Sequence, residues 1–177
     1  MVATLPAELD VRRLTDAGAE LEGALPLAGM ERLADMMLGP GREQVSVRLR
    51  FLRDETGRRL LRGQLQAPVT CRCQRCLEPV RLDLEHDFTI EFVWGMSQLP
   101  QVEHNHSPYV LEGDEPLSLA ELVEDELILA MPVVARHGGV ESCEPPRHDA
   151  DRGEATDGGA GGGEGPFAGL ARLKSRK

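Results

Sequence analysis

Strict alternation of apolar and polar side chains constrains this chain more than any other feature. Every second residue from Val80 to Phe92 is apolar, apart from His86. A period of two places successive side chains on opposite faces, so it predicts a β-strand with one buried face. Residues 45–51 and 61–69 show the same period, and short links join all three stretches. We therefore predict an antiparallel β-meander.

One helix stands out after these strands, over residues 118–131. Ser118 and Glu121 form a capping box at its start, and Pro132 ends it. A shorter helix is predicted over residues 31–38, and the first 27 residues are not assigned. The fold class is therefore α+β: a meander sheet, open or barrel-like, packed against one main helix. The apolar helix face comprises Leu119, Leu122, Val123, Leu127 and Met131, and the acidic face comprises Glu121, Glu124 and Asp125.

The composition changes abruptly after Cys143. We expect residues 1–143 to form a single core domain, and residues 144–165 to be a flexible linker, because this Gly-rich stretch has almost nothing to bury. Residues 166–177 form a short basic and apolar tail, which we expect to dock on a partner. Its candidate contact residues are Phe167, Leu170, Leu173 and Lys174.

The charge is strongly segregated along the sequence. The net charge is -10, yet residues 42–81 contain ten arginines against four acids, and residues 100–126 contain eight acids and no Lys or Arg. A basic strip on the polar sides of adjacent strands could contact RNA phosphates. The alternative is cross-strand pairing with Asp83, Glu85 and Asp87. The candidate RNA-contacting residues are Arg48, Arg50, Arg62, Arg72, Arg75 and Arg81.

Three of the four cysteines lie in "TCRCQRCLEPV", residues 70–80. Cys73 and Cys76 have the spacing that lets two thiolates bind one ion from a tight turn, and His137 and Cys143 could complete a structural zinc site. Cys71 is a possible substitute ligand. Two alternatives stay open: the cysteines pack as small apolar groups, or they form a redox pair, which would need a strand-then-helix context rather than a turn between strands.

Other function classes receive no support from the residues. No Gly-rich phosphate loop, Ser-His-Asp arrangement or paired-carboxylate motif occurs, so we expect neither an enzyme nor a small-molecule substrate. No stretch approaches the roughly 18 apolar residues of a membrane helix, and the start lacks the pattern of a signal peptide. We expect a cytoplasmic protein. The acidic helix face could dock a basic partner.

The order of "VRLRFLRDETG", "CQRCLEPV", "VEDELILAMPVV" and "PFAGLARLK" resembles the YceD family of large ribosomal RNA subunit accumulation proteins. The resemblance spans about residues 5–175 and implies a non-enzymatic bacterial factor needed for accumulation of the large-subunit (23S) ribosomal RNA. Cys71 and the long Gly-rich insertion depart from the family pattern. The positions that match the family are Cys73, Arg75, Cys76, Glu124, Asp125, Glu126, His137, Cys143 and the tail from Pro166 to Lys174.

Our leading hypothesis is a zinc-stabilised ribosome-biogenesis factor that binds precursor RNA or an early large-subunit ribosomal protein. The first alternative is a zinc-stabilised protein-protein adaptor without RNA contact, which would use the acidic helix face and the tail. The second alternative is a thiol oxidoreductase.

Overall fold

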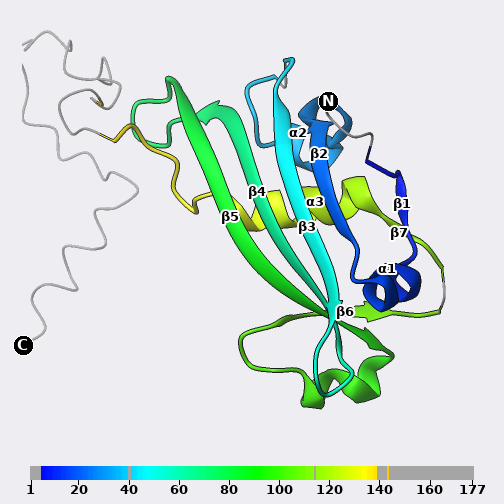
Figure 1. Ribbon diagram of the computed structural model, residues 1–177. Helices are drawn as coiled ribbons and strands as arrows, with labels where there is room; N and C mark the ends of the chain where they lie inside the picture. Colours follow the sequence, from blue (N-terminus) through cyan, green and yellow to red (C-terminus); the bar gives the residue numbers. More distant parts are fainter. Residues whose placement is uncertain (1–4, 40, 114, 139–142, 144–177) are drawn as a thin grey trace, which may run out of the picture. The chain divides into compact units, whose positions relative to one another are not determined.

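Figure 1 shows the computed structural model, which describes residues 5–39, 41–113, 115–138 and 143. The chain separates into two units, Met1–Pro146 and Arg147–Lys177, and every described residue belongs to the first. The predicted linker over residues 144–165 lies outside the described residues. The same holds for the predicted tail contacts Phe167, Leu170, Leu173 and Lys174.

Five strands form one open sheet in the order β2-β3-β4-β5-β6. The strands from β2 to β5 pair antiparallel, and β6 joins β5 in parallel. The predicted meander of three strands is confirmed, whereas the barrel-like alternative is wrong, because β2 and β6 do not pair in the described part of the chain. The bounds are β2 Glu20–Pro26, β3 Gln44–Arg53, β4 Arg59–Arg72, β5 Pro79–Trp94 and β6 Ser107–Leu111.

The register brings the apolar positions of neighbouring strands to one face. Val47 lies opposite Leu65, and Leu61 lies opposite Ile90. Helix α3 (Leu119–Ala130) crosses this face of the sheet in Figure 1 and buries its apolar side there. Burying one such aliphatic side chain contributes about 1.5–3 kcal/mol. The main predicted helix is therefore confirmed, with Ser118 as its N-cap.

The N-terminal segment, unassigned from sequence, contributes two strands and a helix. Strand β1 (Glu8–Leu9) pairs with β7 (Leu117–Ser118), just before α3. Helix α1 (Val11–Ala17) follows and packs on β3 and β4, and β2 then forms an edge of the sheet. The structure also has two short 3₁₀ segments, η1 (Leu27–Gly29) and η2 (Met96–Gln101).

The predicted helix over residues 31–38 is shorter in the structure, where α2 spans Glu31–Ala34. Its N-cap, Met30, provides no side-chain cap. Glu124 of α3 caps it instead: the carboxylate accepts the backbone N–H of Arg32 at 2.7 Å and of Leu33 at 3.1 Å, and the Arg32 Nη2 at 2.8 Å. Glu124 is 6% exposed, so the prediction that it lies on an exposed acidic face is wrong.

The substitution Glu124→Gln should lower the free energy of unfolding by about 1–3 kcal/mol, since it removes charge-assisted bonds from a buried group. Burial raises the pKa of Glu124, but the N–H of Leu33 and the Arg32 side chain lower it further, so the pKa lies below its usual value. The stabilisation is therefore present above the usual carboxyl pKa and is lost as the pH falls through the lowered pKa.

Urea denaturation at several pH values checks this prediction. The stability difference between the wild type and Glu124→Gln should be largest near neutrality and should shrink in acid. Glu121→Gln is the matched control, because Glu121 is exposed on the same helix. Equal losses for the two variants would contradict the capping role.

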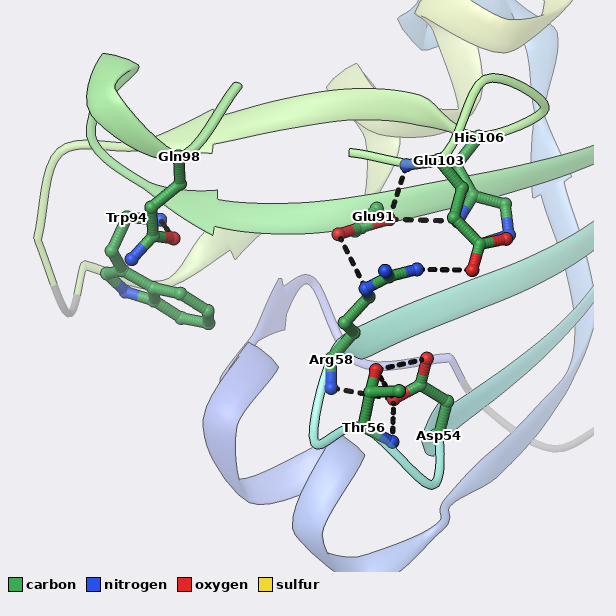
Figure 2. A network of polar contacts seen from close by, with 8 residues as sticks. All are labelled: Asp54, Thr56, Arg58, Glu91, Trp94, Gln98, Glu103 and His106. Carbon is green, nitrogen blue, oxygen red and sulfur yellow. Dashed lines mark hydrogen bonds and ion pairs between the residues drawn. The ribbon is translucent and has the colours of Figure 1, made fainter. Parts of the chain in front are cut away.

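A polar network lies where β3 turns into β4 (Figure 2). This is the end of the sheet opposite the cysteine turn, the β4–β5 turn that carries Cys73 and Cys76. Buried Glu91 of β5 accepts the His106 Nδ1 at 2.9 Å and the backbone N–H of Glu103 at 3.3 Å, and it pairs with the Arg58 Nε at 3.7 Å. Arg58 also pairs with Glu103. Asp54 accepts the backbone N–H of Arg58 at 2.8 Å. The network thus ties the β3–β4 turn to the segment before β6.

Candidate functional site

The turn between β4 and β5 places Cys73 and Cys76 together. The Cys73 N–H donates to the Glu78 carbonyl at 2.8 Å, and the Leu77 N–H donates to the Cys73 carbonyl at 3.0 Å. Leu77 has φ 67, a left-handed conformation that bulky residues rarely adopt. These bonds close a tight loop in which Cys73 is fully buried and Cys76 is half-buried.

The segment after α3 returns to this turn. The Gln74 N–H donates to the Ala135 carbonyl at 2.8 Å, and the Gln74 Nε2 donates to the Val133 carbonyl at 3.4 Å. This contact fixes the chain just before His137 and directs it toward the cysteines. Cys143, which follows, is buried beside Cys73.

Four potential ligand atoms converge at this point. One atom each from Cys73, Cys76, His137 and Cys143 lies within 4.8 Å of the others. The Cys73 and Cys143 sulfurs are 3.4 Å apart, and the Cys76 sulfur lies 3.5 Å from the His137 Nδ1. Tetrahedral zinc, with its usual bond lengths, separates two sulfurs by about 3.8 Å and a sulfur from a nitrogen by about 3.6 Å. The four residues therefore fit a zinc ion.

Neighbouring backbone groups orient these ligands. The His137 Nε2 donates to the Pro79 carbonyl at 3.0 Å, which leaves Nδ1 as the nitrogen with a free lone pair. The Arg75 N–H points at the Cys73 sulfur at 3.5 Å. Ligating histidines commonly donate their second ring nitrogen in this way, so the hydrogen-bond pattern matches that of a metal site.

The thiols differ in acidity. Backbone N–H groups, first that of Cys76, lower the pKa of Cys73 to about 5, although burial opposes the shift. Burial raises the pKa of Cys143 and that of Cys71. Cys71 packs in the same small cluster, against Val80 and Ala135, but it is not one of the four converging residues. Of Cys71, Cys73 and Cys143, Cys73 is therefore the thiol that loses its proton most readily.

The four converging residues supply as many ligands as one tetrahedral metal ion binds. Four protein ligands fill a tetrahedral shell, as in structural rather than catalytic zinc sites. The sequence prediction that Cys73, Cys76, His137 and Cys143 meet at one point agrees with this geometry. Their role as ligands, and that of Cys71 as a substitute, stays a prediction.

The arginines of the predicted strip that belong to strands lie on the polar face of the sheet, away from α3: Arg48, Arg50, Arg62, Arg72 and Arg81. Arg48 pairs with Glu22 at 3.0 Å, and Arg50 pairs with Glu20 at 3.3 Å. The sequence predicts such partners on the third strand of the meander, whereas in the structure most come from β2, which has no clear sequence signal. Among the described residues, Arg81 alone contacts one of the expected acids, Asp83, at 3.6 Å, but both lie on β5, so this pair does not join two strands.

Three arginines of the strip keep unpaired guanidinium groups among the described residues: Arg62, Arg72 and Arg75. All three are exposed. Arg62 lies mid-strand in β4, whereas Arg72 ends β4 and Arg75 lies between Cys73 and Cys76. The cationic groups available to a ligand are therefore concentrated at the cysteine turn.

The acidic helix face is largely engaged in intramolecular contacts. Asp125 pairs with Arg32 at 2.6 Å. Glu126 is buried and contacts the His86 Nε2 at 2.9 Å. Of the residues predicted to bind a partner through this face, Glu121 alone is exposed and, within the described ranges, without an ion pair. Also within these ranges, no helix has the length and apolar character to span a membrane.

Comparisons with known proteins identify the family. The profile of the family described as "Large ribosomal RNA subunit accumulation protein YceD" matches residues 61–174. The chain belongs to the YceD family. The large ribosomal RNA subunit accumulation protein YceD of Haemophilus influenzae is 33% identical over 138 residues, which cover 77% of this chain and 78% of the relative. The predicted resemblance is therefore confirmed. No solved structure matches the chain significantly.

Proposed function

We propose that this YceD-family chain is a non-enzymatic factor that supports accumulation of large-subunit ribosomal RNA. The family description and the Haemophilus influenzae relative support the biological role. The observation that carries the molecular proposal is the convergence of Cys73, Cys76, His137 and Cys143 beside unpaired arginines. In this proposal the protein acts in the cytoplasm as a structured scaffold that binds RNA.

In this proposal a structural zinc ion stabilises the β4–β5 turn, where the RNA would bind. Bound by Cys73, Cys76, His137 and Cys143, it would join the β4–β5 turn to the segment after α3. Arg75 lies inside the loop that the two nearest ligands define. A fixed loop holds its guanidinium in place before RNA arrives, which reduces the entropy lost on binding.

RNA contact would depend on those arginines of the strip that have no ion pair among the described residues. Arg72 and Arg75 can form bidentate bonds to phosphate, and Arg62 extends the same face. Arg48, Arg50 and Arg81 already have acidic partners, so we expect them to contribute less. Because the net charge of -10 repels phosphates at long range, binding should be local and salt-sensitive. An early large-subunit ribosomal protein is the alternative partner.

Charge reversal at the turn tests the RNA contact. Arg72→Glu/Arg75→Glu should weaken binding to large-subunit RNA fragments by roughly tenfold or more and should lower the salt slope by about 1.5–2, as two phosphate contacts are lost. Fluorescence anisotropy over a salt series measures both. Comparing Arg75→Glu alone with Arg13→Glu, which reverses an exposed arginine of α1, controls for net charge. Equal weakening by these two single variants would refute a specific contact.

A further inference from the structure

The outer edge of β5 is paired along only part of its length. Strand β6 covers Ile90–Trp94. From Pro79 to Thr89, no strand in the described part of the chain pairs with β5 on the side away from β4. Figure 1 shows this stretch running along the border of the sheet toward the cysteine turn. An unpaired edge is a template for another strand.

Two observations establish which backbone groups face outward. The Thr70 carbonyl accepts the Leu38 N–H at 2.8 Å, so Thr70 directs its backbone away from β5. Thr70 lies opposite Arg81, which must therefore direct its own N–H and C=O to the open edge. The β4–β5 register is continuous, so the same orientation repeats at every second residue. The outward-facing residues after Arg81 are Asp83, Glu85 and Asp87.

Bulges and prolines usually prevent an edge strand from pairing with another chain, and this stretch of β5 has few of them. The ladder with β4 has no bulge, and Pro79 stands only at the start of the strand. The Pro79 carbonyl accepts the His137 Nε2, but no such contact covers the next residues within the described ranges. Charged side chains are the remaining protection, and they select among partners instead of excluding all of them.

The charge along this edge is acidic. The side chains of Asp83, Glu85 and Asp87 are exposed on the polar face, and Glu85 and Asp87 have no ion pair among the described residues. Their cross-strand neighbours are uncharged: Asp87 lies opposite Gln64, and Glu85 lies opposite Gln66. This row, here called the acidic edge, repels RNA phosphates. It also repels the same edge of a second copy, because like charges would face each other.

On the opposite face of the sheet, where α3 packs, the surface beside this edge is partly apolar. Leu129 of α3 is 70% exposed, although Leu122 and Leu127 of the same helix are buried. A hollow of about 600 Å³ extends around this edge. Leu129, Phe88 and His86 line it on the side of α3, and Asp87, Arg48, Arg50 and Arg62 line it on the polar side, where Arg48 and Arg50 are already paired with Glu22 and Glu20. A strand added to β5 would place alternate side chains toward the acidic edge and toward Leu129. The chemistry of the two faces therefore requires alternating basic and apolar residues.

We propose that the stretch from Pro79 to Thr89 binds an extended segment of a basic partner protein as an added β-strand. Backbone bonds to the outward groups of Asp83, Glu85 and Asp87 hold the segment, and its Lys or Arg side chains pair with the carboxylates of these residues. Its intervening apolar side chains pack near Leu129. The stretch contains neither Arg72 nor Arg75, so the proposal does not depend on an RNA contact by these two residues.

Two synthetic peptides of equal charge test the proposal against the full chain. An acetylated (Lys-Val)₄ peptide can form a strand, whereas the same peptide with every backbone nitrogen methylated keeps the charge but lacks the N–H donors that a ladder needs. We expect (Lys-Val)₄ to bind at least about tenfold more tightly, since the lost ladder bonds each contribute free energy. Hydrogen exchange should slow at the amides of Arg81, Asp83, Glu85 and Asp87. Equal binding of the peptides, or no binding, would overturn the proposal.

Two substitutions at one position separate backbone pairing from charge. Glu85→Pro removes an outward N–H that β4 does not use, the position at which an edge strand tolerates proline. It should abolish (Lys-Val)₄ binding, whereas Glu85→Gln should weaken it only several-fold, because pairing persists. Thermal melts confirm that both variants fold. Equal effects of the two variants, or dimerisation through this edge in sedimentation, would contradict the proposal. Arg72→Glu/Arg75→Glu should leave peptide binding unchanged.

Discussion

Replacing Cys73 and Cys76 together with serine should release zinc and lower the melting temperature by roughly 10 °C. A metal held at about a thousand times its dissociation constant stabilises the folded chain by about 4 kcal/mol, and 1 kcal/mol shifts the Tm of a chain of this size by about 2–4 °C. The double substitution removes half of the ligands that join the β4–β5 turn to the segment after α3. The apolar core under α3 should remain folded at room temperature.

Elemental analysis and calorimetry measure these effects. The wild type should contain one zinc ion per chain, and the double variant none. Cys71→Ser is the matched control, because Cys71 is buried in the same cluster but is not one of the four converging residues. It should keep the metal. A wild-type protein purified without any metal would disprove the zinc proposal, and loss of zinc from Cys71→Ser would assign Cys71 as a ligand.

Gly63→Ala should be the most damaging conservative substitution in the sheet. A Cβ at Gly63 would lie 2.0 Å from the Phe88 Cζ, because the ring of Phe88 packs over the glycine from the neighbouring strand. The ring must leave its site or the strands must separate. Since overpacking of a filled core costs about 1–3 kcal/mol, and this contact is very short, we expect a loss of about 2–3 kcal/mol in urea denaturation.

A double-mutant cycle tests the cause of this loss. Phe88→Leu removes the ring, so Gly63→Ala should cost less in that background than in the wild type. Gly29→Ala provides the control, because an added Cβ there meets no atom within 4 Å. Additive effects of Gly63→Ala and Phe88→Leu would show that the clash with the ring is not the cause.

The strands that could be predicted from sequence are those whose signal is local. The alternation of apolar and polar residues in β3, β4 and β5 requires only that one face of each strand is buried. The structure confirms these strands and pairs them in continuous register. Strand β2 was missed because Gly23 and Pro26 weaken its pattern, and its burial does not alternate strongly. Strand β1 is held by pairing with β7, far away in the sequence, and two residues carry no periodicity.

The candidate site likewise combines local features with contacts between segments that are far apart in the sequence. The spacing of Cys73 and Cys76 is a local property of a turn, so the sequence predicted it. The approach of His137 and Cys143 to that turn was also predicted, from the number of ligands that zinc needs. The contact that brings the chain back, the Gln74 N–H donating to the Ala135 carbonyl, is one that no spacing reveals. Glu124 was misplaced because its partners belong to α2, although its position beside Val123 at the border of the apolar face was a signal of burial.

The single tryptophan lies at the end of β5 farthest from the cysteines. Trp94 stacks under the Arg12 guanidinium at 4.4 Å, whereas Pro79 begins the strand beside the cysteine turn. Fully extended strand between them would span roughly 50 Å. Intrinsic fluorescence therefore reports on one terminus of the hairpin only. Unfolding followed by this emission and unfolding followed by cysteine accessibility should coincide if the domain melts as one unit, and any gap between them measures how independently the two ends open.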